Sequence, residues 1–139
     1  MEGSRTLNIL LVEDDRVDVM NVRRAFERAH ILNPIWVAGD GIDALEMLRR
    51  GDVPHDDLLI LLDLNLPRMD GIEFLGVLRQ DDELGRTPVV VLTTSDAETD
   101  RMRAYDFNVA GYIVKPVTFP AFVDAVATLN KYWMLVEMP

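Results

Sequence analysis

The stretch that most constrains the fold is a run of five apolar residues that ends at a single acid. Leu58–Leu62 contains no polar residue, and Asp63 follows it directly. A run of this length, bounded by polar residues and by Pro67, is typical of a strand covered on both faces. Such strands belong to parallel sheets, where ligands bind beyond the carboxyl ends of the strands. Asp63 therefore stands where a site would lie, although an aspartate in this position equally fits a turn residue or a helix N-cap.

Apolar segments and helical patterns alternate five times along the chain. Besides Leu58–Leu62, strands are predicted at residues 7–12, 35–38, 89–92 and 111–114. Helical spacing follows each strand, over about residues 15–30 and 97–107, after the turns at Asp40-Gly41 and Asp70-Gly71, and after Thr118. This pattern predicts an α/β fold, a doubly wound, flavodoxin-like sheet of five parallel strands in the order 2-1-3-4-5. The helix at 97–107 has a thin apolar stripe, Met102 and Tyr105, so we expect it to be the least firmly packed.

Size and charge narrow the class of protein. The chain has 139 residues, which suits one domain, and a net charge of −10, which repels nucleic acids and anionic membranes. It contains no cysteine, which excludes a thiol nucleophile and a cysteine metal site. The N-terminus has no signal-peptide pattern, and no apolar run approaches the roughly 20 residues that cross a bilayer. We therefore expect a cytoplasmic protein whose partner is basic or a cation, with residues 1–6 disordered.

The predicted strand order brings acidic side chains together at one edge of the sheet. Glu13, Asp14 and Asp15 end the first strand, and Asp63 ends its neighbour. Crowded carboxylates repel one another, and a hard divalent cation relieves that repulsion. We expect Mg²⁺ to be held by Glu13, Asp14, Asp63 and the backbone carbonyl of Asn65, with Asp15 as a helix N-cap. The alternative for Glu13 and Asp14 is that they are solvated acids favoured by a helix dipole.

Two further strands end in residues that suit phosphoryl transfer. Thr93 follows the fourth strand and offers a hydroxyl, and Lys115 follows the fifth and offers an ammonium. Each alone also fits a plainer role, as a helix N-cap and a surface lysine. Together with a nucleophilic carboxylate and a cation, they supply the positioning and the charge stabilisation that phosphoryl transfer needs. Asp63 would be the attacking group.

Five segments, in order and correctly spaced, carry a family resemblance: Leu11–Asp15, Leu61–Pro67, Met69–Gly71, Val91–Thr94 and Gly111–Pro116. Over about residues 7–133 the chain resembles the receiver domains of bacterial response regulators in two-component signalling. The resemblance implies that Asp63 is the phosphoacceptor. It also implies that Glu13 and Asp14 hold Mg²⁺ with the carbonyl of Asn65 beside them.

The same resemblance assigns the switch. Thr93 matches the switch hydroxyl and Lys115 the lysine that pairs with the phosphate. Tyr112 matches the aromatic residue that turns inward when Thr93 is drawn to the phosphate, although it also fits an edge-strand aromatic packed on the last helix. Thr94 departs from the common pattern, in which a small residue follows the switch threonine, and its bulk bears on access of the hydrolytic water.

The resemblance implies a signalling protein rather than an enzyme with an external substrate. It would take a phosphoryl group from a histidine kinase, catalyse its own phosphorylation and dephosphorylation, and change the surface of the 97–107 helix, the last strand and the last helix. We predict a receiver domain at 7–134, an apolar tail at 135–139 and no output domain, so the target is another protein or a second copy. The apolar segment Tyr132–Val136 favours a homodimer, or else folds back on the core. Residues 90–95 and Trp133 also resemble the stand-alone receivers of bacterial phytochrome kinases.

Three competing functions are weaker. An aspartyl-phosphate hydrolase needs an acid two residues after the nucleophile, where this chain has Asn65. A flavin-binding module needs a hydroxyl- and glycine-rich loop after the first strand, where this chain is acidic. A degenerate receiver that acts only as a scaffold would not keep the acids, Thr93 and Lys115 together.

Overall fold

Five strands and five helices alternate along residues 7–135, the part of the chain that this computed structural model describes. The strands are β1 (Asn8–Val12), β2 (Ile35–Ala38), β3 (Leu58–Leu62), β4 (Val89–Thr93) and β5 (Gly111–Val114). The helices are α1 (Arg16–Arg28), α2 (Gly41–Arg50), α3 (Gly71–Arg79), α4 (Glu98–Asp106) and α5 (Phe119–Leu135). The strands pair in parallel in the order β2-β1-β3-β4-β5, which confirms the predicted topology.

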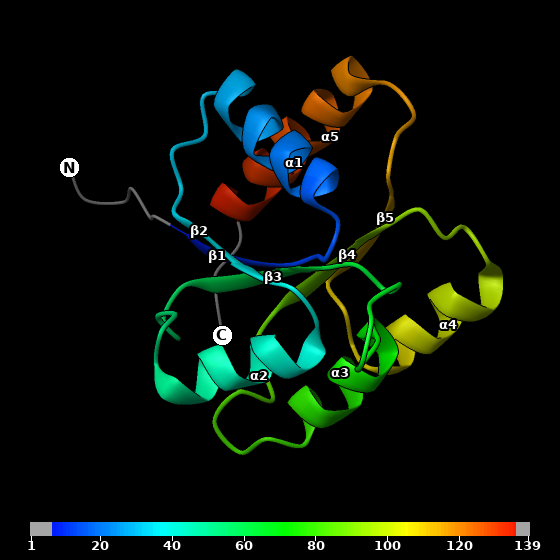
Figure 1. Cartoon of the computed structure of the whole chain (residues 1–139). Coiled ribbons are helices and arrows are strands. Elements are labelled where there is room, and N and C mark those ends of the chain that lie inside the picture. Colours follow the sequence, from blue (N-terminus) through cyan, green and yellow to red (C-terminus); the bar gives the residue numbers. More distant parts are fainter. Residues whose placement is uncertain (1–6, 136–139) are drawn as a thin grey trace.

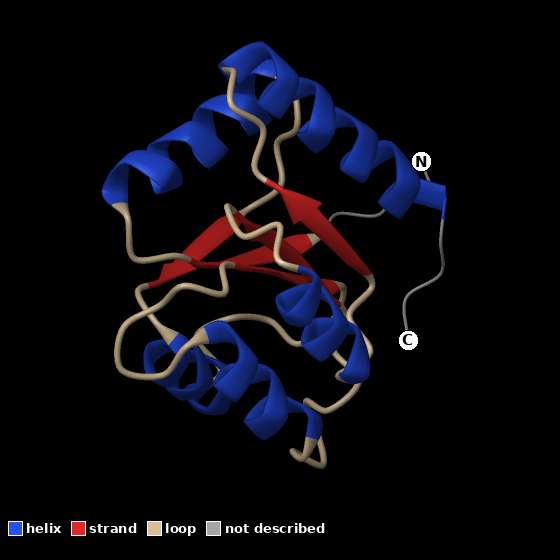
Figure 2. Cartoon of the chain, turned by 90° about the vertical axis from the view of Figure 1, so that its right-hand side faces the viewer, coloured by secondary structure: helices blue, strands red, loops and turns tan. Residues whose placement is uncertain are grey.

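The sheet lies between two helical layers, with α1 and α5 on one face and α2, α3 and α4 on the other (Figure 1 and Figure 2). Every residue of β3 is buried, as its unbroken apolar run predicts. Alternate residues serve the two faces, since Leu59 and Leu61 pack in the core under α1 and α5 while Ile60 and Leu62 pack under α2 and α3. The strand that carries Asp63 at its end is therefore fixed from both sides.

Aspartates cap the helices that follow the first three strands. Asp15 is the N-cap of α1 and its side chain accepts the amide protons of Val17 and Asp18, which confirms its predicted role. Asp40 caps α2, and Asp70 caps α3 in a reciprocal capping box with Glu73. These caps fix where the helices begin, and hence the loops that carry the site.

A single guanidinium joins α3 to the loops before β4 and β5. Arg79 is half-buried at the end of α3, and burial lowers the pKa of its guanidinium. It donates hydrogen bonds of 2.7–3.3 Å to the backbone carbonyls of Phe107, Gly85, Thr87 and Asn108. These carbonyls would otherwise need other donors, so Arg79 holds the two loops to the helix.

Two predictions about helices were wrong in detail. Helix α1 was expected to reach His30, but it ends at Arg28, and His30 has a positive φ of 60°. Met102 and Tyr105 were expected to form the inward stripe of α4, but both are exposed, and Ala104 is the buried residue of this helix. A small residue faces the core there, so α4 contributes little apolar surface of its own.

Trp133, near the end of α5, is buried in the core under α1 and α5, whereas Tyr132 is exposed. Trp133 therefore folds back on its own core, one of the two alternatives considered for this segment. The predicted disordered segment 1–6 and residues 136–139 of the predicted tail lie outside the described residues. Among the helices of residues 7–135, none combines the length and the apolar character that crossing a bilayer requires.

Candidate functional site

The acids that end β1 and β3 face each other across the sheet edge. Val12 and Leu62 are register partners, so the residues after them, Glu13 and Asp63, leave neighbouring strands at the same level. The backbone amide of Asp63 donates to the carbonyl of Val12 at 3.1 Å, which continues the pairing by one residue. Both acidic side chains are buried. The fold thus concentrates negative charge at one point, as the strand order predicts.

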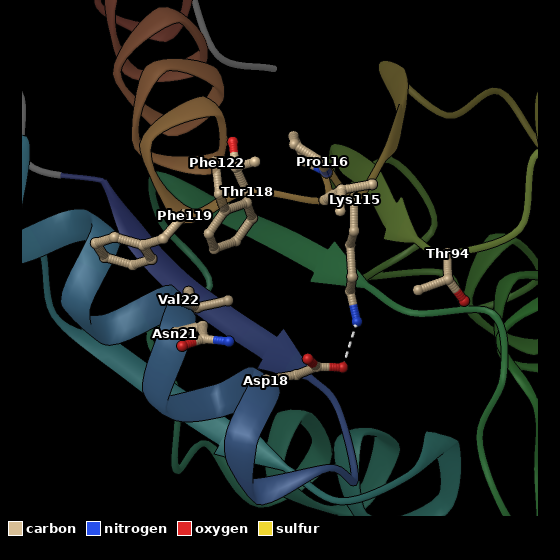
Figure 3. A pocket seen from close by; sticks show the side chains of 10 residues that line it. Asp18, Asn21, Val22, Thr94, Lys115, Pro116, Thr118, Phe119 and Phe122 are labelled. Carbon is tan, nitrogen blue, oxygen red and sulfur yellow. Dashed lines mark hydrogen bonds and ion pairs between the residues drawn. The ribbon is translucent and has the colours of Figure 1, made fainter.

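The ammonium of Lys115 lies between three carboxylates. Its Nζ is 2.7 Å from Glu13 Oε1, 2.8 Å from Asp18 Oδ2 and 3.4 Å from Asp63 Oδ2. Figure 3 shows Lys115 extending from the end of β5 to Asp18 on the first turn of α1. Burial by itself would lower the pKa of Lys115, but the hydrogen bonds to Asp18 and Glu13 and the charge of Asp63 hold it above its usual range. Lys115 therefore stays charged.

Burial raises the pKa of Glu13 to about 7 from an ordinary value of 4.5. The hydrogen bond from Lys115 works against this rise, and the negative charge of Asp63 adds to it. Three carboxylates share one ammonium, so the ionised site keeps an excess of negative charge that one lysine does not neutralise. A bound cation would offset this excess of negative charge.

The donor set fits a hard divalent cation. Oxygen atoms of Glu13, Asp18 and Asp63 all lie within 4.8 Å of one another. Carboxylate oxygens are the ligands that Mg²⁺ and Mn²⁺ prefer. Asp14, predicted to be a ligand, is exposed and does not belong to this group of three. The amide of Asn65 donates to Asp63 Oδ1 at 3.2 Å, so Asn65 orients the acid through its N–H.

One residue of the β4–α4 loop, Ser95, connects Thr93 to Tyr112 by hydrogen bonds. Thr93 is fully buried, and its Oγ1 accepts the amide proton of Ser95 at 3.4 Å. The carbonyl of Ser95 accepts the Tyr112 hydroxyl at 2.9 Å, and the Ser95 hydroxyl donates to Asp100 of α4 at 2.6 Å. The half-buried Tyr112 side chain also packs against the core under α2 and α3 rather than against α5 alone. A movement of Thr93 would therefore act directly on both Tyr112 and α4.

Close packing at Gly71 holds the loop that carries the phosphoacceptor candidate. The Gly71 amide donates to the carbonyl of Leu64 at 3.0 Å. A Cβ atom at Gly71 would lie 2.6 Å from the backbone oxygen of Asp63 and 2.7 Å from the Cα of Leu64. Any residue with a Cβ atom would clash here, so a glycine at position 71 allows the start of α3 to pack closely against the end of β3.

A second contact fixes the far side of the same loop. Arg68 pairs with Asp40, the buried N-cap of α2, at 2.6 Å and with Asp43 at 3.1 Å. Burial would raise the pKa of Asp40, but the hydrogen bonds from Arg68 and from backbone amides of α2, together with the charge of Arg68, hold that pKa below its usual range. The loop after Asp63 is thus tied to α2 as well as to α3.

Sequence reasoning missed two residues of the site, Asp18 and Ser95. Asp18 is held against Lys115 because it lies one helical turn before Val22, a buried residue of α1. That spacing of four residues from an apolar position was a usable signal. Thr94, expected at the mouth of the site, is exposed and lines a groove of about 400 Å³ beside Lys115 and Asp18 (Figure 3).

Comparison with known proteins agrees with this geometry. Residues 9–127 match the family described as the response regulator receiver domain. The chain is 38% identical over 136 residues to the probable methanogenesis regulatory protein FilR2 of Methanothrix harundinacea, covering 96% of this chain and 88% of that protein. It is 36% identical over 129 residues to the response regulator Rcp1 of Synechocystis sp., covering 91% of this chain and 88% of that protein.

Two solved structures match over nearly the whole chain. The phosphorylated cyanobacterial phytochrome response regulator RcpA has a TM-score of 0.85 at 34% identity, covering 97% of this chain and 99% of that one. The Mn²⁺-bound form of Rcp1 has a TM-score of 0.83 at 34% identity, covering 96% of this chain and 99% of that one.

Proposed function

The chain belongs to the response regulator receiver domain family of two-component systems, and from this premise we propose that Asp63 is its phosphoacceptor. The observation that carries the proposal is the placing of Asp63. Its buried carboxylate ends the central strand, beside the second acid Glu13 and 3.4 Å from the Lys115 ammonium. The Asn65 amide holds one carboxylate oxygen, and Lys115 lies near the other.

In the proposed reaction an oxygen of Asp63 attacks the phosphorus atom of the donor. The new P–O bond forms as the bond from phosphorus to the donor's leaving atom breaks, and the electron pair leaves with that atom. Lys115 pairs with one phosphoryl oxygen and the Thr93 hydroxyl donates to another. Water later attacks phosphorus, releases phosphate and restores the carboxylate. The protein thus catalyses its own phosphorylation and dephosphorylation.

We infer that the resident cation is Mg²⁺, held by the carboxylates of Glu13 and Asp63, while Asp18, the third acid of the group, is paired with Lys115. When bound, it supplies positive charge that offsets the repulsion between those acids and an incoming phosphoryl group. The support is the oxygen donor set and the Mn²⁺-bound form of the relative Rcp1. Asp14 and the Asn65 carbonyl stay predicted ligands, and Mg²⁺ titration of Asp14→Asn tests the first of them.

The proposed signal passes from Thr93 to Tyr112 through Ser95. Phosphorylation replaces the singly charged carboxylate of Asp63 with an acyl phosphate that carries up to about two negative charges, a net gain of about one, and its phosphoryl oxygens attract the Thr93 hydroxyl. The hydrogen bonds of Ser95 to Thr93, Tyr112 and α4 then carry the displacement to the outer surface of α4, β5 and α5.

The proposed phosphodonor is a histidine kinase of the phytochrome type. The support is the matched relative RcpA, which is a cyanobacterial phytochrome response regulator. The proposed recipient of the signal is a protein that binds the α4–β5–α5 surface. The cytoplasm stays the predicted location.

We also infer that a second copy of the chain binds the α4–β5–α5 surface. Tyr105 and Tyr132 are exposed there, beside a hollow of about 680 Å³ lined by β5 and α5. Gel filtration with light scattering, with and without beryllofluoride as a phosphoryl mimic, tests this inference, with Tyr132→Ser as the variant. A monomer in both states contradicts it.

Intact-mass measurement after treatment with acetyl phosphate and Mg²⁺ tests the phosphoacceptor. The wild type should gain one phosphoryl group, and it should gain none when a chelator removes Mg²⁺. Asp63→Asn should gain none in either case. Asp82→Asn removes the same charge from an exposed position and serves as the control. Equal labelling of Asp63→Asn and wild type would move the site elsewhere.

A further inference from the structure

The three hydrogen-bond donors of the Lys115 ammonium are all engaged, and unequally. The 2.7 Å and 2.8 Å contacts go to Glu13 and Asp18, whereas the contact to Asp63 is the longest, at 3.4 Å. A short hydrogen bond to a phosphoryl oxygen on Asp63 would replace the long contact to Asp63, and it requires the ammonium to move toward Asp63 and so away from Glu13 or Asp18. Glu13 and Asp18 are therefore the two carboxylates that the ammonium could leave.

Exposure separates the candidates. The side chain of Glu13 is 2% exposed and that of Asp18 is 34% exposed. A released Glu13 would be left as a buried charge without its partner, which is costly. A released Asp18 regains water at little cost, because it lies on the first turn of α1 at the edge of the groove in Figure 3. Asp18 is therefore the partner that the lysine leaves.

We propose that Asp18 is a positioning residue that holds Lys115 away from Asp63 in the unphosphorylated protein and releases it when a phosphoryl group arrives. This role rests on the proposed function, because it concerns the same lysine and the same phosphoacceptor. Asp18 makes no contact with Asp63 among the hydrogen bonds of the described residues, so it acts through Lys115. Its removal makes the phosphoryl state easier to reach.

Binding of beryllofluoride in the presence of Mg²⁺, followed by ¹⁹F NMR, measures this effect. Asp18→Asn removes the charge and keeps the size, and Asp18→Ala removes both. The ion pair of Lys115 with the partly exposed Asp18 contributes modestly, so each variant should bind beryllofluoride about threefold to tenfold more tightly than wild type. Glu27→Gln removes the same charge from an exposed position at the other end of α1, and is the matched control.

A double-variant cycle separates the proposed role from a general loss of negative charge. In a Lys115→Met background, Asp18→Asn should improve binding no more than Glu27→Gln does, because the group that Asp18 restrains is gone. Structural damage would weaken binding, so it cannot imitate the expected gain.

Three results would overturn the role. The first is unchanged or weaker binding in both Asp18 variants, and the second is a gain that persists without Lys115. In either case binding by the wild type leaves the proposed function standing. The third is a wild type that binds no beryllofluoride with Mg²⁺, which overturns the proposed function and this role together.

Discussion

Replacing Glu13 with glutamine should change how the stability of the fold depends on pH. Burial raises the pKa of Glu13 to about 7, against an ordinary value of 4.5. Between these two values the folded protein keeps a proton that the unfolded chain releases. The contribution of this proton is fully present below pH 4.5 and is lost as the pH rises through 7, so the free energy of unfolding falls over that window. Glu13→Gln has no proton to lose there.

The size of the effect follows from the two pKa values. The full difference corresponds to about 3 kcal/mol, and most of it, about 2 to 3 kcal/mol, is lost between pH 5 and pH 8. Lys115, whose pKa is raised, stays charged throughout that range and adds no slope. The stability of Glu13→Gln relative to wild type should therefore rise by about 2 to 3 kcal/mol from pH 5 to pH 8.

Urea unfolding of both proteins at the two pH values, in chelator, measures this difference. Asp82→Asn is the control for loss of an exposed acid and should run parallel to wild type. Adding Mg²⁺ at pH 8 should restore stability to wild type more than to Glu13→Gln, since the cation binds the ionised acid. A difference between the two proteins that is constant with pH, or that shrinks as pH rises, refutes the reasoning.

Four other substitutions test the scaffold of the site by urea unfolding and acetyl phosphate labelling. Gly71→Ala should lower the free energy of unfolding by about 1–3 kcal/mol and slow phosphorylation, because its Cβ would meet the backbone of Asp63. Gly76→Ala, in the same helix with only a phenyl ring at 3.6 Å, should instead stabilise by about 0.5–1 kcal/mol. Arg79→Met should cost about 3 kcal/mol because four carbonyls lose a charged donor, and a cost below about 1 kcal/mol contradicts that account. Tyr112→Phe should cost about 1 kcal/mol and leave labelling of Asp63 intact, and lost labelling would show that the tyrosine acts in the chemistry itself.

Most of the fold could be predicted because burial on both faces gives strands sharp ends. Leu58–Leu62 is apolar throughout for the same reason that it is a central strand, and its predicted bounds are the observed ones. Helix α4 shows the limit of this reasoning. Met102 and Tyr105 are three residues apart and suggest a face, but the small Ala104 allows close packing and turns them outward. Two apolar residues do not determine the phase of a helix when a smaller one competes.

The site divides in the same way. Glu13, Asp63 and Lys115 follow strands, and parallel strands bring their carboxyl ends together whatever the side chains do. Asp18 lies on a helix, and the direction in which its side chain points depends on how that helix is rotated about its axis. Lys115 has a side chain long enough to reach several acids. Strand order therefore predicts which backbones meet, but it does not predict which carboxylate the lysine takes. The pairing of Lys115 depends on how deeply each carboxylate is buried, which the sequence shows only indirectly.

The unequal contacts of Lys115 connect the fold to its proposed switching. One ammonium among three carboxylates leaves a charge imbalance, and the raised pKa of Glu13 shows that burial of this acid is not fully compensated. A cation and a phosphoryl group together would change the balance, since the first offsets the acids and the second attracts the lysine. In the proposed switching, Lys115 stays on Asp18 while both are absent, and it leaves this more exposed acid when the phosphoryl group arrives. The same imbalance thus accounts for the need for a cation and for a lysine that can change partner.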